Sequence, residues 1–158
     1  MAILEVPTQF LTFTLAEEVF GVDIARVREV LEFTAITKMP HAPMEMIGVI
    51  NLRGHVVPVM DLRLKFGMPE GERTVNTCII ILEVTAGDGS TTVIGALADS
   101  VKEVLELQPD QVAQPPKIGL SVRTDFIMGM GKQADHFTIL LDTDKVFSQE
   151  ELAGLAAA

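Results

Sequence analysis

The chain repeats VFGVDIARVREVLEF (residues 19–33) as VIGALADSVKEVLEL (residues 93–107), with seven of fifteen positions identical in an ungapped alignment. A weaker similarity links residues 48–66 to residues 129–147. The landmarks shared by this second pair are Gly48 with Gly129, Asp61 with Asp142, and Phe66 with Phe147. The offsets are 74 and 81 residues, so one unit of about 75 residues occurs twice. Two similar small halves are therefore expected, rather than a solenoid of many short repeats.

Length and composition describe a globular chain with an acidic surface. The 158 residues match one domain in size, and halves of this size bury little surface alone, so each half is expected to pack against the other. An apolar fraction of 48% excludes a disordered chain. The net charge of −10 disfavours nucleic acid and anionic membrane surfaces as partners, because both attract basic protein surfaces.

The single cysteine, Cys78, lies in an apolar run, which indicates a buried thiol and a reducing compartment. The longest purely apolar run, residues 78–82, is too short to cross a bilayer. No secretory signal is expected, because a basic segment followed by an apolar one is missing at the start of the sequence. The chain is therefore expected to be cytoplasmic and not inserted in a membrane.

Apolar alternation and turn residues predict about ten short strands and a few short helices. The expected elements are a hairpin of strands 9–15 and 18–24, one helical turn and a strand over 29–33, strands on both sides of Arg53-Gly54, a helix over 62–66 capped by Asp61, strands 77–85, 91–98, 126–131 and 136–141, and a closing helix over 142–152. A helix over 24–31 competes with the turn and strand, but its β-branched residues favour the strand. Many short strands with frequent turns favour two small β-barrels packed on each other.

The residue types of an active site do not converge in the sequence. The three histidines are scattered, with no ligand spacing to each other or to Cys78, so no metal site is expected. Phosphate loops, nucleotide fingerprints and nucleophile elbows are missing. Asp61, Asp99 and Asp142 each end a strand, where cap and turn roles are favoured over catalysis. We therefore expect no enzyme and no cofactor.

Candidate binding residues lie on a turn and in strands. Arg53 follows a strand on a tight turn, where its guanidinium either reaches a partner across a groove or pairs with a local carboxylate such as Glu29. These two interpretations have equal weight. Gly48 and Gly95 lie in strands, where glycine is unfavourable unless another group approaches closely. That group is a partner, or else the glycines serve packing and a bulge within the protein, and both explanations stay open.

Residues 48–67, GVINLRGHVVPVMDLRLKFG, resemble a signature of the CheW family of bacterial chemotaxis coupling proteins. The resemblance continues in FLTFTLAEEVFGVDIARVREVLEF, IGALADSVKEVLEL and FIMGMGKQADHFTILLDTDKVF, in the order of the family. It covers residues 9–150 as a single CheW-like domain. It implies a mainly β fold of two pseudo-symmetric five-stranded β-barrel subdomains with short helices and a C-terminal helix. The expected division is residues 16–76 and 77–150, with the N-terminal strand as a possible addition to the second subdomain.

The resemblance also implies a function: a non-catalytic adaptor that links the cytoplasmic tip of methyl-accepting chemoreceptors to the regulatory domain of the histidine kinase CheA. The adaptor is then cytoplasmic, a monomer when free, and recruited to membrane-associated receptor arrays. A stand-alone β-barrel module that binds peptides in another signalling complex is the alternative. A small hydrolase that uses Asp61 or Asp142 with a histidine is the third candidate.

Family positions carried onto this chain predict two binding surfaces. The receptor groove between the subdomains would include Val27, Glu29, Gly48, Arg53, Cys78, Gly95, Val101 and Val104. The kinase contact, at one end of the first subdomain, would include Ile24, Val30 and Pro43. The chain departs from the family at residues 96–99, where Ala-Leu-Ala-Asp replaces a frequent Val-Val-Asp and leaves the shape of the pocket open.

Overall fold

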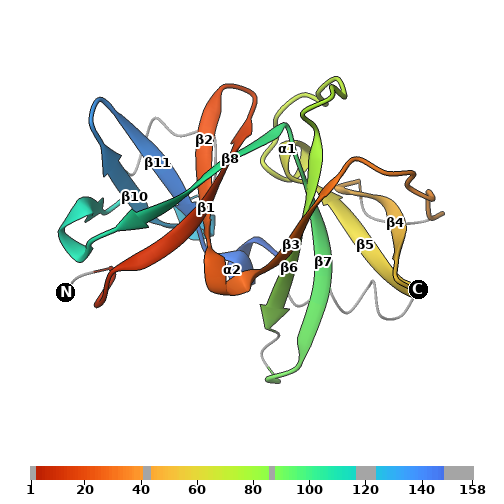
Figure 1. The fold of residues 1–158 in the computed structure, drawn as a ribbon, viewed down its shortest axis with the longest axis horizontal. Helices are drawn as coiled ribbons and strands as arrows, with labels where there is room; N and C mark the ends of the chain where they lie inside the picture. The colour runs from red at the N-terminus through yellow and green to blue at the C-terminus, as the bar shows by residue number, and fades with distance from the viewer. Residues whose placement is uncertain (1–2, 41–43, 86–87, 117–123, 148–158) are drawn as a thin grey trace.

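Two β-sheets lie side by side and make up the fold (Figure 1). The computed structural model describes residues 3–40, 44–85, 88–116 and 124–147. Sheet A consists, in order, of β8 (Ser100–Leu107), β1 (Thr8–Leu15), β2 (Glu18–Asp23), β11 (His136–Leu141), β10 (Ile127–Gln133) and β9 (Val112–Ala113). Sheet B consists, in order, of β3 (Val27–Glu32), β6 (Cys78–Thr85), β7 (Thr91–Ala98), β5 (His55–Asp61) and β4 (Met46–Leu52). The prediction of a mainly β fold is confirmed.

Short helical segments connect the strands. The described residues contain α1 (Leu62–Lys65), α2 (Thr143–Val146) and 3₁₀ turns at Ile24–Arg26, Pro109–Gln111 and Thr124–Phe126. The turn at Ile24–Arg26 followed by β3 agrees with the favoured interpretation, not with a helix over 24–31. Of the expected closing helix, residues 148–152 lie outside the described part of the chain. Sheet A has six strands instead of five because Val112–Ala113 pairs with β10.

Each repeat carries the chain from one sheet to the other. Residues 19–33 contain β2 of sheet A and β3 of sheet B, whereas residues 93–107 contain β7 of sheet B and β8 of sheet A. The register repeats as well, because Gly21 of β2 lies beside Leu140 in a parallel pair and Gly95 of β7 lies beside Val59 in another. The two sheets therefore have the same order of equivalent strands, with the β1–β2 and β6–β7 hairpins exchanged between the halves.

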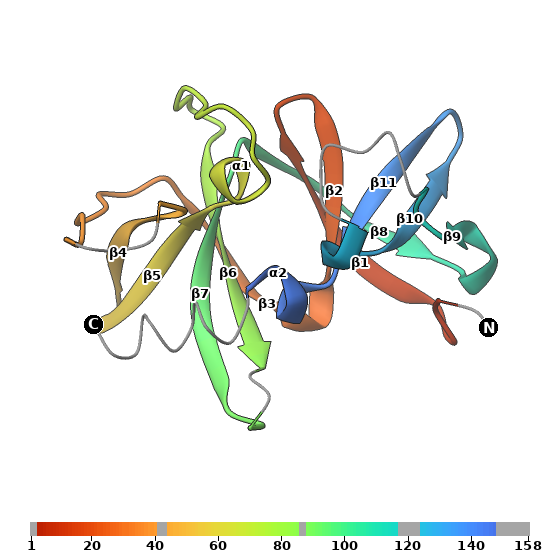
Figure 2. The same cartoon turned by 180° about the vertical axis from the view of Figure 1, so that it is seen from behind.

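This exchange corrects the expected division into residues 16–76 and 77–150. Both strands of the β6–β7 hairpin, within residues 78–98, pair with strands of sheet B. Sheet B therefore spans residues 27–98, and sheet A combines residues 8–23 with residues 100–141. The boundary was misplaced because strand alternation shows that a segment is a strand but not which sheet it joins. The N-terminal strand, β1, pairs with β8 and lies in sheet A (Figure 2).

The boundary between the two sheets, here called the seam, is filled by a shared hydrophobic core. Its aromatic members form a chain of contacts from Phe13 and Phe20 of sheet A through Phe66, which follows α1, to Phe126, which precedes β10. The centroids of successive rings are 5.9, 5.8 and 5.9 Å apart. Two smaller clusters lie within the individual sheets. They are Ile50, Val57, Val59, Ile79 and Ile81 in sheet B, and Leu4, Phe10, Leu107 and Leu140 around sheet A.

The strand ladders leave both sheets open among the described residues, although two β-barrels were expected. The edges of sheet B, β3 and β4, are joined only locally. The chain beyond β3 pairs with β4 through two backbone hydrogen bonds, from the Thr37 N–H to the Val49 carbonyl at 2.9 Å and back at 2.8 Å. Gly48 makes this approach possible, because a Cβ there would lie 2.3 Å from the Thr37 carbonyl oxygen. Its φ of +151° also disfavours other residues.

We expect G48A to lower the free energy of unfolding by about 3 kcal/mol, because the new methyl group would push the Thr37 segment away from β4. G89A is the matched control, since Gly89 has φ +87° but no atom within 4 Å of its ideal Cβ. Only the backbone strain of about 1 kcal/mol is expected there. Urea unfolding measures both, and equal losses in the two variants would contradict the role given to close approach.

Candidate partner-binding surface

Arg53 and Glu29, two of the predicted receptor residues, form an ion pair across the open edges of sheet B. Arg53 has φ +50° in the β4–β5 turn, and Gly54 follows with φ +85°. The Asn51 side chain accepts a hydrogen bond from the Gly54 N–H at 2.8 Å, which holds this turn. The guanidinium donates two hydrogen bonds to the carboxylate on β3, one from Nη1 at 3.3 Å and one from Nη2.

The pair matches the interpretation of Arg53 as a turn arginine with a local carboxylate, and it still leaves the guanidinium 70% exposed. The hydrogen bond from Arg53 lowers the pKa of Glu29, and the carboxylate raises the pKa of Arg53 in return. Both groups are therefore charged near neutral pH. Because an arginine has five N–H donors, Arg53 can hold Glu29 and still donate to a second carboxylate.

Cys78 and Val101 meet at the point where the chain leaves sheet B for sheet A. Cys78 opens β6 and is buried, as predicted, and its thiol donates to the Asn76 carbonyl at 3.2 Å. Burial raises the pKa of this thiol, and a hydrogen bond from the Val101 backbone opposes the shift. Val101 near the start of β8 and Val27 at the start of β3 both pack against the shared core. Their side chains therefore line the seam from its two crossovers.

The two predicted glycines are internal. Gly48 and Gly95 are both buried. Gly48 accommodates the Thr37 segment, and a Cβ on Gly95 would lie 2.8 Å from Cγ2 of Ile79. The structure therefore gives both glycines a packing role, and they can influence a partner only through the shape of the backbone.

The predicted apolar residues that point outward are two valines at equivalent repeat positions. Val30 on β3 is 41% exposed and Val104 on β8 is 48% exposed. Both strands are edges of their sheets. Ile24, predicted for the kinase contact, is partly buried against the shared core, and Pro43 lies outside the described residues. The prediction placed Val30 and Val104 on different surfaces, and they lie on different sheets.

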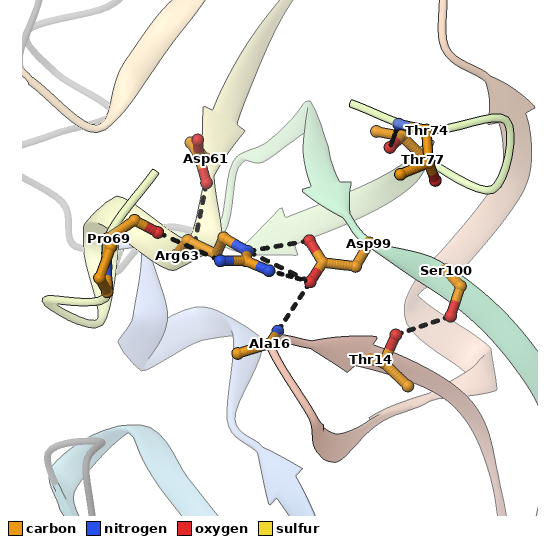
Figure 3. Close-up of polar contacts among 9 residues, drawn as sticks. All are labelled: Thr14, Ala16, Asp61, Arg63, Pro69, Thr74, Thr77, Asp99 and Ser100. Atoms are coloured by element: carbon orange, nitrogen blue, oxygen red, sulfur yellow. Dashed lines mark hydrogen bonds and ion pairs between the residues drawn. The ribbon is translucent and has the colours of Figure 1, made fainter. Parts of the chain in front are cut away.

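A polar network that the sequence did not reveal crosses the seam (Figure 3). Arg63 of α1 donates to Asp99 from Nε at 3.0 Å and from Nη2 at 2.5 Å. Asp99, between β7 and β8, also accepts the Ala16 N–H of the β1–β2 turn at 2.7 Å. Arg63 and Asp99, with Asp61, help line a pocket at the surface. Below the network the seam is packed by the shared core, so a helix from a partner would have to lie over it.

A second polar network crosses the seam and joins α2 to the crossover between β2 and β3. Arg26 in the turn between β2 and β3 donates to Asp144 of α2 at 3.0 Å and to the Thr85 hydroxyl at 3.0 Å. The second oxygen of Asp144 accepts the Thr85 N–H at 3.0 Å. No local pattern could have revealed these contacts, because Arg26 and Asp144 are 118 positions apart.

The two aspartates of the hydrolase interpretation are N-cap residues of short helices. Asp61 is buried and accepts the Arg63 N–H at 2.9 Å as the N-cap of α1, and Asp142 is the N-cap residue of α2. His136 pairs with Asp135 at 3.0 Å on the surface. The described part of the chain contains no group of three or more metal-ligating side chains. In the same residues, no helix combines the length and the apolar character needed to cross a membrane.

Fold and surface together define a small two-sheet binding module whose candidate contacts lie on edge strands, turns and crossovers. The model of the CheW-like domain matches residues 9–151. The chain is 34% identical to the chemotaxis protein CheW of Klebsiella aerogenes over 92% of this chain and 84% of the relative. It is 34% identical to chemotaxis protein CheW of Rhizobium meliloti over 90% of this chain and 89% of the relative.

A solved structure has the same fold. The crystal structure of scaffolding protein TtCheW from Thermoanaerobacter tengcongensis superimposes with a TM-score of 0.81 and 32% identity, and covers 94% of this chain and 92% of that one. The chain therefore belongs to the CheW family, and the resemblance seen in residues 9–150 is confirmed.

Asp61 gives a prediction for the dependence of stability on pH. Burial raises the pKa of Asp61, so the folded state binds its proton more tightly than the unfolded state does. The free energy of unfolding should therefore fall as pH rises from the ordinary range of an aspartate through the raised pKa. D61N keeps a capping side chain without the charge. Its stability should match the wild type near pH 3 and exceed it at pH 7, as measured by urea unfolding.

The control for this prediction is D61A, which removes the cap of α1 and should lose about 1 kcal/mol. If D61N were less stable than the wild type at pH 7, the buried charge of Asp61 would be stabilising and the argument would be wrong.

Proposed function

We propose that this chain is a non-catalytic coupling protein of chemotaxis. It holds the cytoplasmic tip of a methyl-accepting chemoreceptor and the regulatory domain of the histidine kinase CheA in one complex. The observation that carries this proposal is the match to relatives named chemotaxis protein CheW over nearly the whole of both chains. The name of the similar structure, a scaffolding protein, agrees with it. The protein acts in the cytoplasm and joins receptor arrays at the membrane through its partners.

The receptor side is proposed to lie over sheet B and the crossover into β8. It comprises Val27, Glu29, Gly48, Arg53, Cys78, Gly95, Val101 and Val104. Arg53 supports this assignment because Glu29 fixes its guanidinium in an exposed position, ready to pair with a carboxylate of a receptor helix. The buried glycines act through backbone shape. A helical tip that lies against this surface uses the helix-in-groove mode of recognition.

The kinase side is proposed to include Ile24, Val30 and Pro43. Val30 supports it, because it is an exposed apolar side chain on an edge strand, between Arg28 and Glu32 on the same face of that strand. Its repeat equivalent, Val104, is assigned to the receptor. The two equivalent positions of the repeat would thus contact two different partners. The adaptor is a monomer when free and needs no cofactor.

We expect R53A to weaken binding to receptor vesicles by about tenfold while the fold is kept, because a desolvated charge-assisted contact would be lost. R28A is the matched control. Arg28 lies on β3 and pairs with Glu83 at 2.7 Å, so R28A removes a similar surface ion pair from a residue that is not assigned to the receptor side. Co-sedimentation with receptor-containing vesicles measures affinity. Equal binding by R53A and wild type would remove Arg53 from the receptor site.

The assignment of the two exposed valines is tested by V30D and V104D. V30D should reduce kinase in the pellet about tenfold or more and leave receptor binding unchanged, because a charge would be buried at the kinase contact. V104D should do the reverse. Reconstituted co-sedimentation with vesicles and purified kinase separates the two readouts. Loss of the same partner in both variants would contradict the assignment of the two valines to different partners.

A further inference from the structure

Because the hairpins are exchanged, the folding chain has two similar sites on which each hairpin could dock. The first half, residues 8–66, donates the β1–β2 hairpin to sheet A, and the second half, residues 78–147, donates the β6–β7 hairpin to sheet B. The two docking sites are alike, because Gly21 sits beside Leu140 as Gly95 sits beside Val59. Backbone register alone would therefore also allow a hairpin to dock on the like half of a second copy.

The two ion pairs across the seam differ in polarity at equivalent places. Arg63 of α1 and Asp144 of α2 occupy the same repeat position, 81 residues apart. Each contacts the crossover that belongs to the other half. Arg63 contacts Asp99 from the second half, and Asp144 contacts Arg26 from the first half. In the repeat alignment Asp99 falls on the residue next to Arg26.

The charges therefore separate by half. Both seam residues of the first half, Arg26 and Arg63, are cations, and both of the second half, Asp99 and Asp144, are anions. Pairing unlike halves brings opposite charges together, as observed. Pairing two first halves would set Arg26 against Arg63, and pairing two second halves would set Asp99 against Asp144. All four side chains are mostly shielded from solvent, with exposures of 20–35%, so this repulsion is only partly screened.

We propose that the two seam ion pairs select the pairing of unlike halves and oppose the docking of a hairpin on the like half of a second copy. Asp99 and Asp144 also accept backbone N–H groups at the hairpin ends, from Ala16 and Thr85. A pairing of two first halves would have neither acceptor in its seams. The device thus combines attraction in the native pairing with repulsion in the competing one.

The test is a charge exchange within one ion pair. R63D/D99R keeps opposite charges in both native contacts, but it also gives opposite charges to each pairing of like halves. After refolding from denaturant at high protein concentration, its dimer-to-monomer ratio should be about tenfold above that of the wild type, because repulsion has become attraction. Size-exclusion chromatography with light scattering measures the ratio. R26D/D144R tests the same logic with Asp99 and Ala16 untouched.

The quadruple variant R26D/R63D/D99R/D144R is the decisive control. It reverses every charge, so native contacts stay opposite and like-half contacts are again alike, and its dimer ratio should return to the wild-type level. The wild-type ratio should also rise in about 1 M salt, which screens the charges. The proposal is overturned if neither double variant dimerises more than the wild type. It is equally overturned if the quadruple variant dimerises as much as the doubles, since lost hydrogen bonds would then explain the effect.

Discussion

The exchange of hairpins between two halves is the constraint on which the rest of this structure depends. Neither sheet is complete without strands from both halves, and the shared core takes apolar side chains from both. The aromatic contacts run from Phe13 and Phe20 of sheet A to Phe66, which follows α1. They then return to Phe126, which precedes β10, so they cross the seam twice. Burial of this core therefore couples the folding of the two sheets, which small separate barrels of this size could hardly sustain alone.

Much of the fold could be predicted because its signals are local. Alternation in residues 9–15 and 18–24 marked the first hairpin, and Asp61 marked the start of α1. The repeat in residues 19–33 and 93–107 indicates two equivalent halves, but it does not show that each repeated segment passes from one sheet to the other. Sheet membership depends on contacts between distant strands, and those leave no trace in the alternation of one strand.

The candidate surface was predictable to a similar extent. The sequence singles out both Arg53 and Glu29. It does not decide between a partner contact and a local ion pair for Arg53, because an exposed guanidinium can make both. For Gly48 the sequence leaves a close approach and a packing role open, and only the structure identifies Thr37 as the group that approaches. The seam ion pairs were missed altogether, since Arg63 and Asp99 acquire their meaning only when α1 meets the second crossover.

Cys78 can serve as a chemical probe of local opening in this architecture. It is the sole thiol of the chain and opens β6, and it is shielded where the chain crosses into β8. A thiol reagent can reach it only when this corner comes apart. The rate of modification therefore reports how often the junction of the two sheets opens locally, without global unfolding of the chain. A partner that bound across this corner would lower the rate of thiol modification, and that decrease would show where the partner binds.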